Sequence, residues 1–124
     1  MKLSTARKVS DSDDSRGDIF ELGDCGNVHI NVLTTRKGHI RGGHYHDYNE
    51  EFFVVSGKFE FHSGFEGVDD ITIRGANETI VTIPGVPHYV KALEDSVMIE
   101  FRPCGTKYKP IDYEPFRKLA RARP

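Results

Sequence analysis

The sequence lacks the features that mark several large classes of protein. It has no run of about 18 apolar residues, and its start, Met1 to Thr5, lacks the apolar core of a signal peptide. Seventeen basic residues stand against nineteen acidic ones, so no broad basic field for nucleic acid exists. Cys25 and Cys104 are too few for a disulfide framework, and free thiols are expected. We therefore expect a soluble cytoplasmic protein that binds neither nucleic acid nor membrane.

The length of 124 residues predicts one domain with its own core. Residues 1–18 are polar and include an acidic run from Ser10 to Ser15, which favours a solvated arm over one that packs on a neighbouring subunit. Residues 19–110 are expected to form the folded body. Residues 111–124 are expected to form a helix and tail.

Short segments with period-two alternation recur about every ten residues along the body, separated by turn residues. Val28, Ile30 and Val32 alternate with less apolar neighbours, which predicts a half-buried strand with His29 on its less apolar face. Residues 97–102 alternate in the same way. The pattern predicts an all-β sandwich or barrel.

The C-terminal segment changes period. Asp112 is suited to cap a helix, Pro115 to its first turn, and Phe116 and Leu119 fall on one side. The basic end of this segment, which includes Arg117, suits a helix C-terminus. A helix packed on the outside of the barrel is favoured over an anion-binding tail.

Residues 38–57 place histidines and carboxylates at a spacing that suits a metal ion. In a strand, His44 and His46 project from the same face with Cα atoms about 6.6 Å apart, so both imidazoles can reach one ion. On a helix they would point in nearly opposite directions. A turn at residues 47–49 brings a carboxylate back beside them, and Glu50 and Glu51 face opposite sides of the following strand. Only one of these two glutamates is therefore expected to be a ligand.

The spacing from Gly38 through His44, His46 and Glu50 to Gly57 resembles the first motif of the cupin superfamily. The segment Pro84-Gly85-Val86-Pro87-His88 resembles the core of the second motif, in which the histidine is the fourth ligand. The asparagine often found four residues after that histidine is replaced by Ala92. The resemblance implies a cupin jelly-roll barrel followed by a short C-terminal helix. It also implies a homodimer, and it assigns Glu50 and His88 to the metal.

Three imidazole nitrogens and one carboxylate oxygen suit a single divalent transition metal, with Fe, Mn, Ni, Zn and Cu all compatible. A site that binds such an ion through His44, His46, Glu50 and His88 leaves positions open for a ligand. The alternative is an inherited site without metal, whose histidines are hydrogen-bonded.

Arg41 is expected on the strand face of Gly43 rather than that of His44, where it is either exposed or a substrate contact. The run from Arg41 to His46 also resembles the Arg-Gly-x-His stretch of cupin-type epimerases and ketoisomerases that act on nucleotide-linked sugars. That resemblance implies substrate contact by Arg41 and a base role for His44. One nitrogen of His44 cannot serve both as base and as metal ligand.

Further candidates follow from position along the strands. We consider Glu100, Tyr89 and Lys91 as proton-transfer groups, and Tyr48 and Arg102, with Arg41, as substrate contacts. The predicted function is metal-assisted isomerisation or epimerisation of a small polar, sugar-like molecule. Iron-dependent oxidation of a small molecule by dioxygen and non-catalytic binding of a small ligand are the alternatives.

Overall fold

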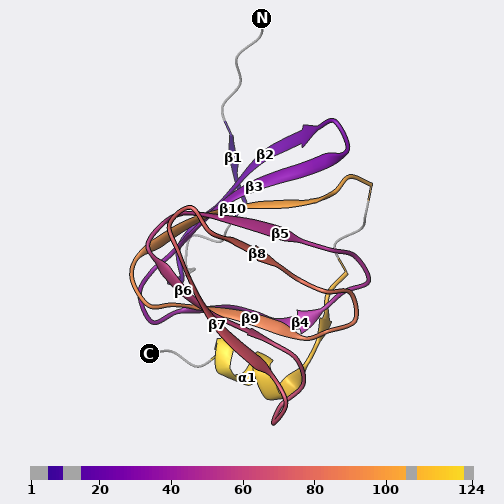
Figure 1. Cartoon of the computed structure of the whole chain (residues 1–124). Coiled ribbons are helices and arrows are strands. Elements are labelled where there is room, and N and C mark those ends of the chain that lie inside the picture. Colours follow the sequence, from indigo (N-terminus) through magenta and orange to yellow (C-terminus); the bar gives the residue numbers. More distant parts are fainter. Residues whose placement is uncertain (1–5, 10–14, 106–108, 122–124) are drawn as a thin grey trace, which may run out of the picture.

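The structure, a computed structural model, describes residues 6–9, 15–105 and 109–121 of the 124-residue chain. These residues form two antiparallel sheets that face each other, and one short helix lies outside the second sheet (Figure 1). The first sheet has six strands, in the spatial order β1 (Arg7–Lys8), β2 (Ile19–Cys25), β3 (Val28–Thr35), β10 (Ser96–Pro103), β5 (Glu51–Ser56) and β8 (Thr79–Val81). The second has five, in the order β11 (Ile111–Asp112), β4 (Ile40–Tyr45), β9 (His88–Ala92), β6 (Lys58–Ser63) and β7 (Asp70–Gly75). The predicted all-β barrel is confirmed.

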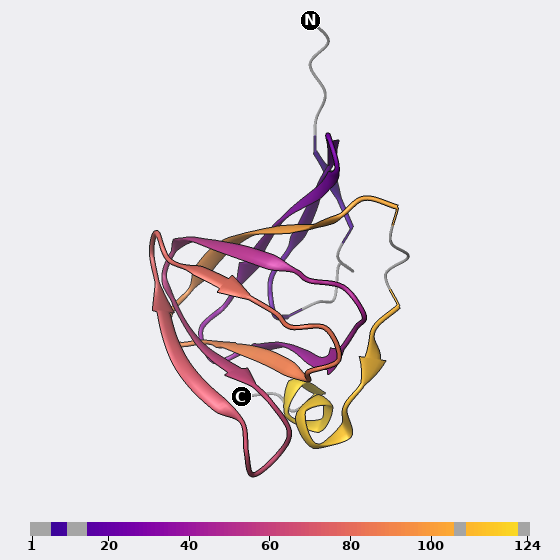
Figure 2. The same ribbon diagram turned by 45° about the vertical axis from the view of Figure 1, so that its right-hand side comes forward.

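An apolar core fills one part of the space between the sheets. Its buried members come from both sheets and are Leu33, Phe52, Val54, Phe59, Ile80, Val90, Ala92 and Met98. Alternate residues of each strand supply these side chains, as the pleat requires. The turned view in Figure 2 shows the two sheets spreading apart toward the side on which β11 and the helix lie.

The C-terminal helix α1 (Glu114–Arg121) packs against β4 and β9. Phe116 is buried there, and its ring meets that of Tyr89 edge-to-face with centroids 4.8 Å apart. The expected helix on the outside of the barrel is therefore present. Asp112 does not cap it, because Asp112 lies in β11 and pairs with His44 of β4, so the final segment adds a strand to the second sheet.

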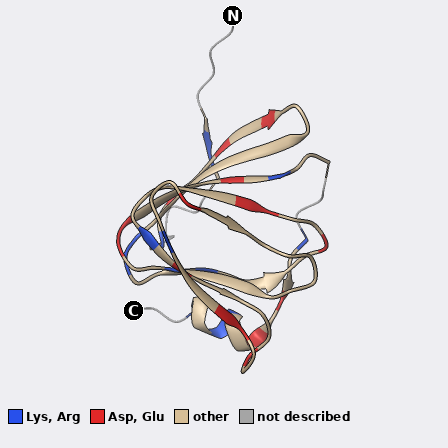
Figure 3. Ribbon diagram, in the orientation of Figure 1, with Lys and Arg blue, Asp and Glu red and all other residues tan. Residues whose placement is uncertain are grey.

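The polar N-terminal segment also contributes to a sheet. In β1, Arg7 and Lys8 pair with Glu21 and Phe20 of β2 in the same chain. Most of the acidic run, residues 10–14, lies outside the described residues. Acidic and basic residues are both scattered over the two sheets of the described ribbon (Figure 3).

The face assigned to β3 from the sequence is wrong. Asn31 and Leu33 are buried on the inner face, whereas Val32 is only partly buried on the outer one. Nδ1 of His29, in the same strand, contacts Oδ1 of Asp24 at 2.7 Å. The inner face of β3 therefore carries both a polar and an apolar residue, Asn31 and Leu33, and both border the cavity.

Both cysteines are free. Within the described part of the chain, no helix has the length and apolar character needed to cross a membrane.

Candidate metal centre

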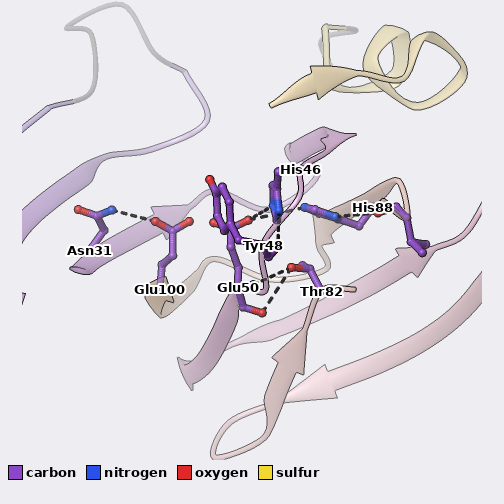
Figure 4. A network of polar contacts seen from close by, with 8 residues as sticks. Asn31, His46, Tyr48, Glu50, Thr82, His88 and Glu100 are labelled. Carbon is purple, nitrogen blue, oxygen red and sulfur yellow. Dashed lines mark hydrogen bonds and ion pairs between the residues drawn. The ribbon is translucent and has the colours of Figure 1, made fainter. Parts of the chain in front are cut away.

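Four side chains with metal-binding donors converge inside the barrel: His44, His46, Glu50 and His88. One ligand atom from each lies within 4.8 Å of all the others. Nε2 of His46 lies 2.5 Å from Oε1 of Glu50, and Nε2 of His88 lies 3.9 Å from the same oxygen. Figure 4 shows His46, Glu50 and His88 turned toward one another. The structure thus brings together the four residues that the sequence pattern selected.

A bulge in β4 gives this cluster its geometry. Gly42 pairs with Tyr89 and His44 with His88, so Gly43 is an extra residue between two regular pairs. A Cβ at Gly43 would lie 2.7 Å from Cα of Arg117, and its φ of +86° also favours glycine. The bulge brings α1 close to β4 and turns His44 into the cavity.

The same bulge corrects the expectation for Arg41. Regular alternation would place Arg41 on the opposite face from His44, but the extra residue shifts the phase, and both line the same cavity. Arg41 is buried, and its Nε donates to Oγ1 of Thr35 at 2.9 Å while Nη2 donates to the carbonyl oxygen of Thr34 at 2.8 Å. Strand β3 therefore fixes this guanidinium in place.

The two neighbouring glutamates differ as expected. Glu50 is 2% exposed, and its backbone N–H donates to Oγ1 of Thr82 at 2.9 Å. Glu51 is exposed, and its side chain lies on the other face of β5. Its backbone pairs with that of Val81 in β8. Only Glu50 can reach the histidines.

Burial keeps two of the histidines neutral. It lowers the pKa of His44 and of His88 to about 4, against the opposing charge of Glu50. For His46, burial alone would lower the pKa, but the hydrogen bond with Glu50 and the charge of Glu50 together raise it. Neutral imidazoles with free nitrogens are the form that binds metal ions.

A second carboxyl group lies beside Glu50. Burial raises the pKa of Glu100, and the hydrogen bond with Glu50 and the charge of Glu50 raise it further, against a hydrogen bond from Asn31. Burial would also raise the pKa of Glu50, but His46 and Glu100 hydrogen-bond to it and lower it. Glu50 is therefore the ionised member of the pair and Glu100 the protonated one.

The donor set fits a divalent transition metal. Oε2 of Glu50 is buried and has no hydrogen-bond partner among the residues that the structure describes, as expected of an oxygen that could bind an ion. Nδ1 of His46 contacts the carbonyl oxygen of Tyr48 at 2.7 Å, which fixes the ring and leaves Nε2 for the ion. Three imidazoles and one carboxylate match Fe, Mn, Ni, Zn or Cu, and the geometry does not favour one of them.

The cluster opens into a cavity of about 540 Å³, a size typical of small-molecule sites. Its floor is apolar and includes Leu33, Phe52 and Met98. Its charged wall has five arginines and four carboxylates, namely Arg7, Arg16, Arg41, Arg102, Arg117, Glu21, Glu50, Glu100 and Asp112. Three of the sequence-predicted candidates, Arg41, Glu100 and Arg102, thus line the cavity.

Two proton-transfer candidates are placed elsewhere. In β9, His88 and Val90 point into the barrel, so Tyr89 and Lys91 between and after them project from the opposite face. Tyr89 stacks on His62 with ring centroids 4.0 Å apart, beneath α1. Neither Tyr89 nor Lys91 lines the cavity, so the structure gives no support to the expectation that they transfer protons there.

Tyr48 does not line the cavity either. Its ring stacks on that of His46 with centroids 4.3 Å apart, and burial raises its pKa to about 12. Tyr48 therefore packs against a candidate metal ligand, and the structure gives no support to the expectation that it contacts the substrate.

The sequence pattern missed Asn31, Asp112 and Arg117. Asn31 lies on the face of β3 that was taken as outer, and Asp112 was assigned to a helix cap. Arg117 was noted only as part of a basic helix end. The sequence held one signal for these residues. Asn31 is a polar residue between two apolar ones, Ile30 and Val32, in a strand that was expected to be half-buried.

The chain matches one known family over most of its length. The family described as "Polysaccharide biosynthesis C-terminal domain" matches residues 12–113. The sequence matches no curated protein.

Several solved structures share the fold. The capsular polysaccharide assembling protein CapF from Staphylococcus aureus is 22% identical with a TM-score of 0.69, over 88% of this chain and 31% of CapF. Oxalate decarboxylase OxdC from Bacillus subtilis is 21% identical with a TM-score of 0.70, over 90% of this chain and 33% of OxdC. KdgF from Halomonas sp. is 21% identical with a TM-score of 0.63, over 75% of this chain and 85% of KdgF. The chain thus spans about a third of CapF and OxdC. A Klebsiella pneumoniae protein with a double-stranded β-helix domain is 18% identical with a TM-score of 0.69, over 85% of each chain, and the likeness establishes that fold.

Proposed function

The chain is a cupin and belongs to the family of polysaccharide biosynthesis C-terminal domains, and from this premise we propose that it is a metal-dependent isomerase or epimerase of a sugar-like molecule. His44, His46, Glu50 and His88 would hold one divalent transition metal. The observation that carries this proposal is the convergence of their four ligand atoms within 4.8 Å at the wall of a ligand-sized cavity. The manganese centres named for oxalate decarboxylase are consistent with metal binding by this fold.

A bound divalent ion would supply a Lewis acid that polarises an oxygen of the ligand. Glu100 would then transfer the proton, because it lines the cavity and holds a proton at neutral pH. Asn31 orients this carboxyl group by donating to Oε1 at 2.8 Å. Arg41, held rigidly by β3, would bind and orient the ligand.

The convergence of donors also bears on the role of His44. A catalytic base in a metal-free epimerase would need its free nitrogen turned toward the ligand alone. In this structure the ligand atom of His44 faces the other three donors. This arrangement favours the ligand role over the base role.

Elemental analysis of protein purified without an affinity tag or chelator tests the proposal. We expect about one transition-metal ion per chain, lost in a His44→Ala, His46→Ala double variant. Bound zinc, manganese or nickel leads to isomerase assays on sugars and sugar derivatives, with turnover that chelation abolishes. Failure to bind any metal after reconstitution would overturn the proposal and favour His44 as a base.

Bound iron would instead favour the oxidation alternative, which oxygen uptake with small acids, thiols and diketones would reveal. Saturable binding of a sugar without product formation would favour the non-catalytic alternative. Both outcomes would replace the isomerase proposal while retaining the metal site.

A further inference from the structure

Helix α1 contributes a charged side chain to the wall of the cavity, although its body packs outside the barrel. Arg117 lines the cavity, and its Nη1 donates to the carbonyl oxygen of Gly42 at 3.0 Å. Its side chain is 30% exposed. The close approach of α1 at Gly43 is what lets Arg117 reach over the bulge of β4.

The guanidinium of Arg117 is only partly satisfied. Its Nε is buried and makes no hydrogen bond with any residue that the structure describes. The nearest carboxylate oxygen, Oδ1 of Asp112, is 3.8 Å away, and Asp112 also lies 3.6 Å from Arg121. Such a half-exposed, shared contact neutralises Arg117 weakly. Arg117 therefore brings to the wall of the cavity a positive charge that its contact with Asp112 cancels only in part.

Arg117 and Arg41 are both neighbours of Gly42, one through a hydrogen bond and the other along the chain. Arg41 precedes Gly42 in β4 and lines the cavity, while Arg117 reaches Gly42 from α1. Asp112 of the adjoining strand pairs with His44, so α1, which follows that strand and carries Arg117, lies at the histidine end of the site. Arg41 lies three residues before His44 in β4, and its guanidinium is held by Thr34 and Thr35 of β3. In Figure 4, β11 and α1 lie on the side of His46 and His88, and Glu100 and Asn31 lie at the other end of the row.

We propose that Arg41 and Arg117 together bind an acidic group of the ligand, so that the substrate is a sugar acid or a sugar phosphate rather than a neutral sugar. This inference rests on the proposed function, because it names the substrate class of the same site. Guanidinium groups bind carboxylate and phosphate through paired, charge-assisted hydrogen bonds. An acidic group held at the histidine end would direct the rest of the sugar toward Glu100.

Three probes with one sugar skeleton separate the possible ligands: D-galactose, D-galacturonate and D-galactose 6-phosphate. Titration calorimetry is carried out with the wild-type protein and with Arg117→Gln, Arg117→Lys and Lys118→Gln variants. Lys118 is the matched control, because it is exposed on the same helix and its replacement removes the same charge. Metal content and thermal unfolding are measured on the same samples.

We expect at least one acidic sugar to bind more tightly than galactose. Arg117→Gln should weaken it about tenfold or more, the cost of losing a charge-assisted hydrogen bond. Arg117→Lys should retain part of the preference, because the charge stays and the paired geometry is lost. Lys118→Gln should behave like the wild type. The preferred acid identifies carboxylate or phosphate as the recognised group.

Equal binding of all three probes, no binding of either acid, or unchanged binding in Arg117→Gln would each overturn the inference. Metal content distinguishes this result from failure of the proposed function. A protein that binds metal without preferring an acidic sugar refutes the role of Arg117 alone. A protein that prefers an acidic sugar through Arg117 but binds no metal refutes the metal proposal alone.

Discussion

Asn31 donates a hydrogen bond of 2.8 Å from its Nδ2 to Oε1 of Glu100, its direct partner across strands β3 and β10. The bond fixes the carboxyl group of Glu100 beside that of Glu50, and both residues are buried. Two carboxyl groups held this closely do not both ionise at neutral pH. The proton that they share is therefore placed at the wall of the cavity.

In the folded protein, ionising Glu100 beside the charged Glu50 costs free energy, and replacing Glu100 by Gln should remove this cost. The pKa of Glu100 is raised from 4.5 to about 8, so the folded protein retains a proton that the unfolded chain releases. The stability that this proton confers is lost as the pH rises through that interval. The unfolding free energy of Glu100→Gln relative to the wild type should therefore increase between about pH 5 and pH 8 and then level off.

Urea unfolding of both proteins at several pH values measures this difference. An Asp95→Asn variant, which changes a carboxylate far from the pair, serves as the control and should show no such trend. A difference that does not vary with pH would mean that Glu100 is already ionised.

Glu50 and Glu51 provide a matched test of the metal centre. Glu50→Gln should strongly reduce the metal content, because Glu50 contributes the only carboxylate oxygen of the described cluster. Glu51→Gln should leave the metal content unchanged, because Glu51 points outward from β5. Elemental analysis of the two variants, prepared side by side, distinguishes them. Loss confined to Glu51→Gln would contradict the assigned ligand set.

The metal-free protein should be sensitive to acid through His88. Burial lowers the pKa of His88 from 6.5 to about 4, so the unfolded chain binds a proton that the folded chain rejects. Lowering the pH from 6.5 to 4 should therefore narrow the stability advantage of the wild type over His88→Gln, by up to about 1.4 kcal/mol per pH unit. Thermal or urea unfolding of both proteins after chelation, at several pH values, measures this difference in stability. A constant difference would show that His88 titrates normally in the folded protein.

Gly43 should be less tolerant of substitution than glycines with the same backbone conformation. Gly43→Ala and Gly67→Ala both place a side chain at positive φ, which costs about 1–2 kcal/mol. Only at Gly43 would the added Cβ meet the backbone of Arg117, at 2.7 Å, whereas nothing lies within 4 Å at Gly67. We expect a further loss of about 1–3 kcal/mol at Gly43, as for other overpacked sites. Equal losses in urea unfolding would show that α1 moves away freely.

Strand geometry predicted that His44 and His46 could share an ion, whereas the choice of Glu50 over Glu51 and the assignment of His88 came from the resemblance to the cupin motifs. His44 and His46 share a face in any strand, and the turn after them returns a carboxylate whatever the surrounding fold. The place of Arg41 was not predictable, because a single extra residue at Gly43 reverses the phase of the strand. Glycines can mark such a bulge, but they do not locate it.

The buried face of β3 was mispredicted for a different reason. Hydrophobic alternation identifies the inner face only when the other face is polar, and here Val28, Ile30 and Val32 lie outside. The inner face instead carries Asn31, which serves the site. The contribution of Arg117 was not predictable either, since it depends on how closely α1 approaches β4.

The apolar outer face of the six-stranded sheet supports the expected homodimer. The strand register aligns Phe20, Val32, Ile99 and Phe53 in one row across β2, β3, β10 and β5. A sheet that is apolar on both faces is usually covered on both. Light scattering should therefore give the mass of two copies, and Ile99→Lys should give that of one. Ile73→Lys, on the exposed edge strand β7, is the control and should leave the dimer intact. A monomeric wild-type protein would refute this expectation, because it would show that no second copy covers this row of apolar residues.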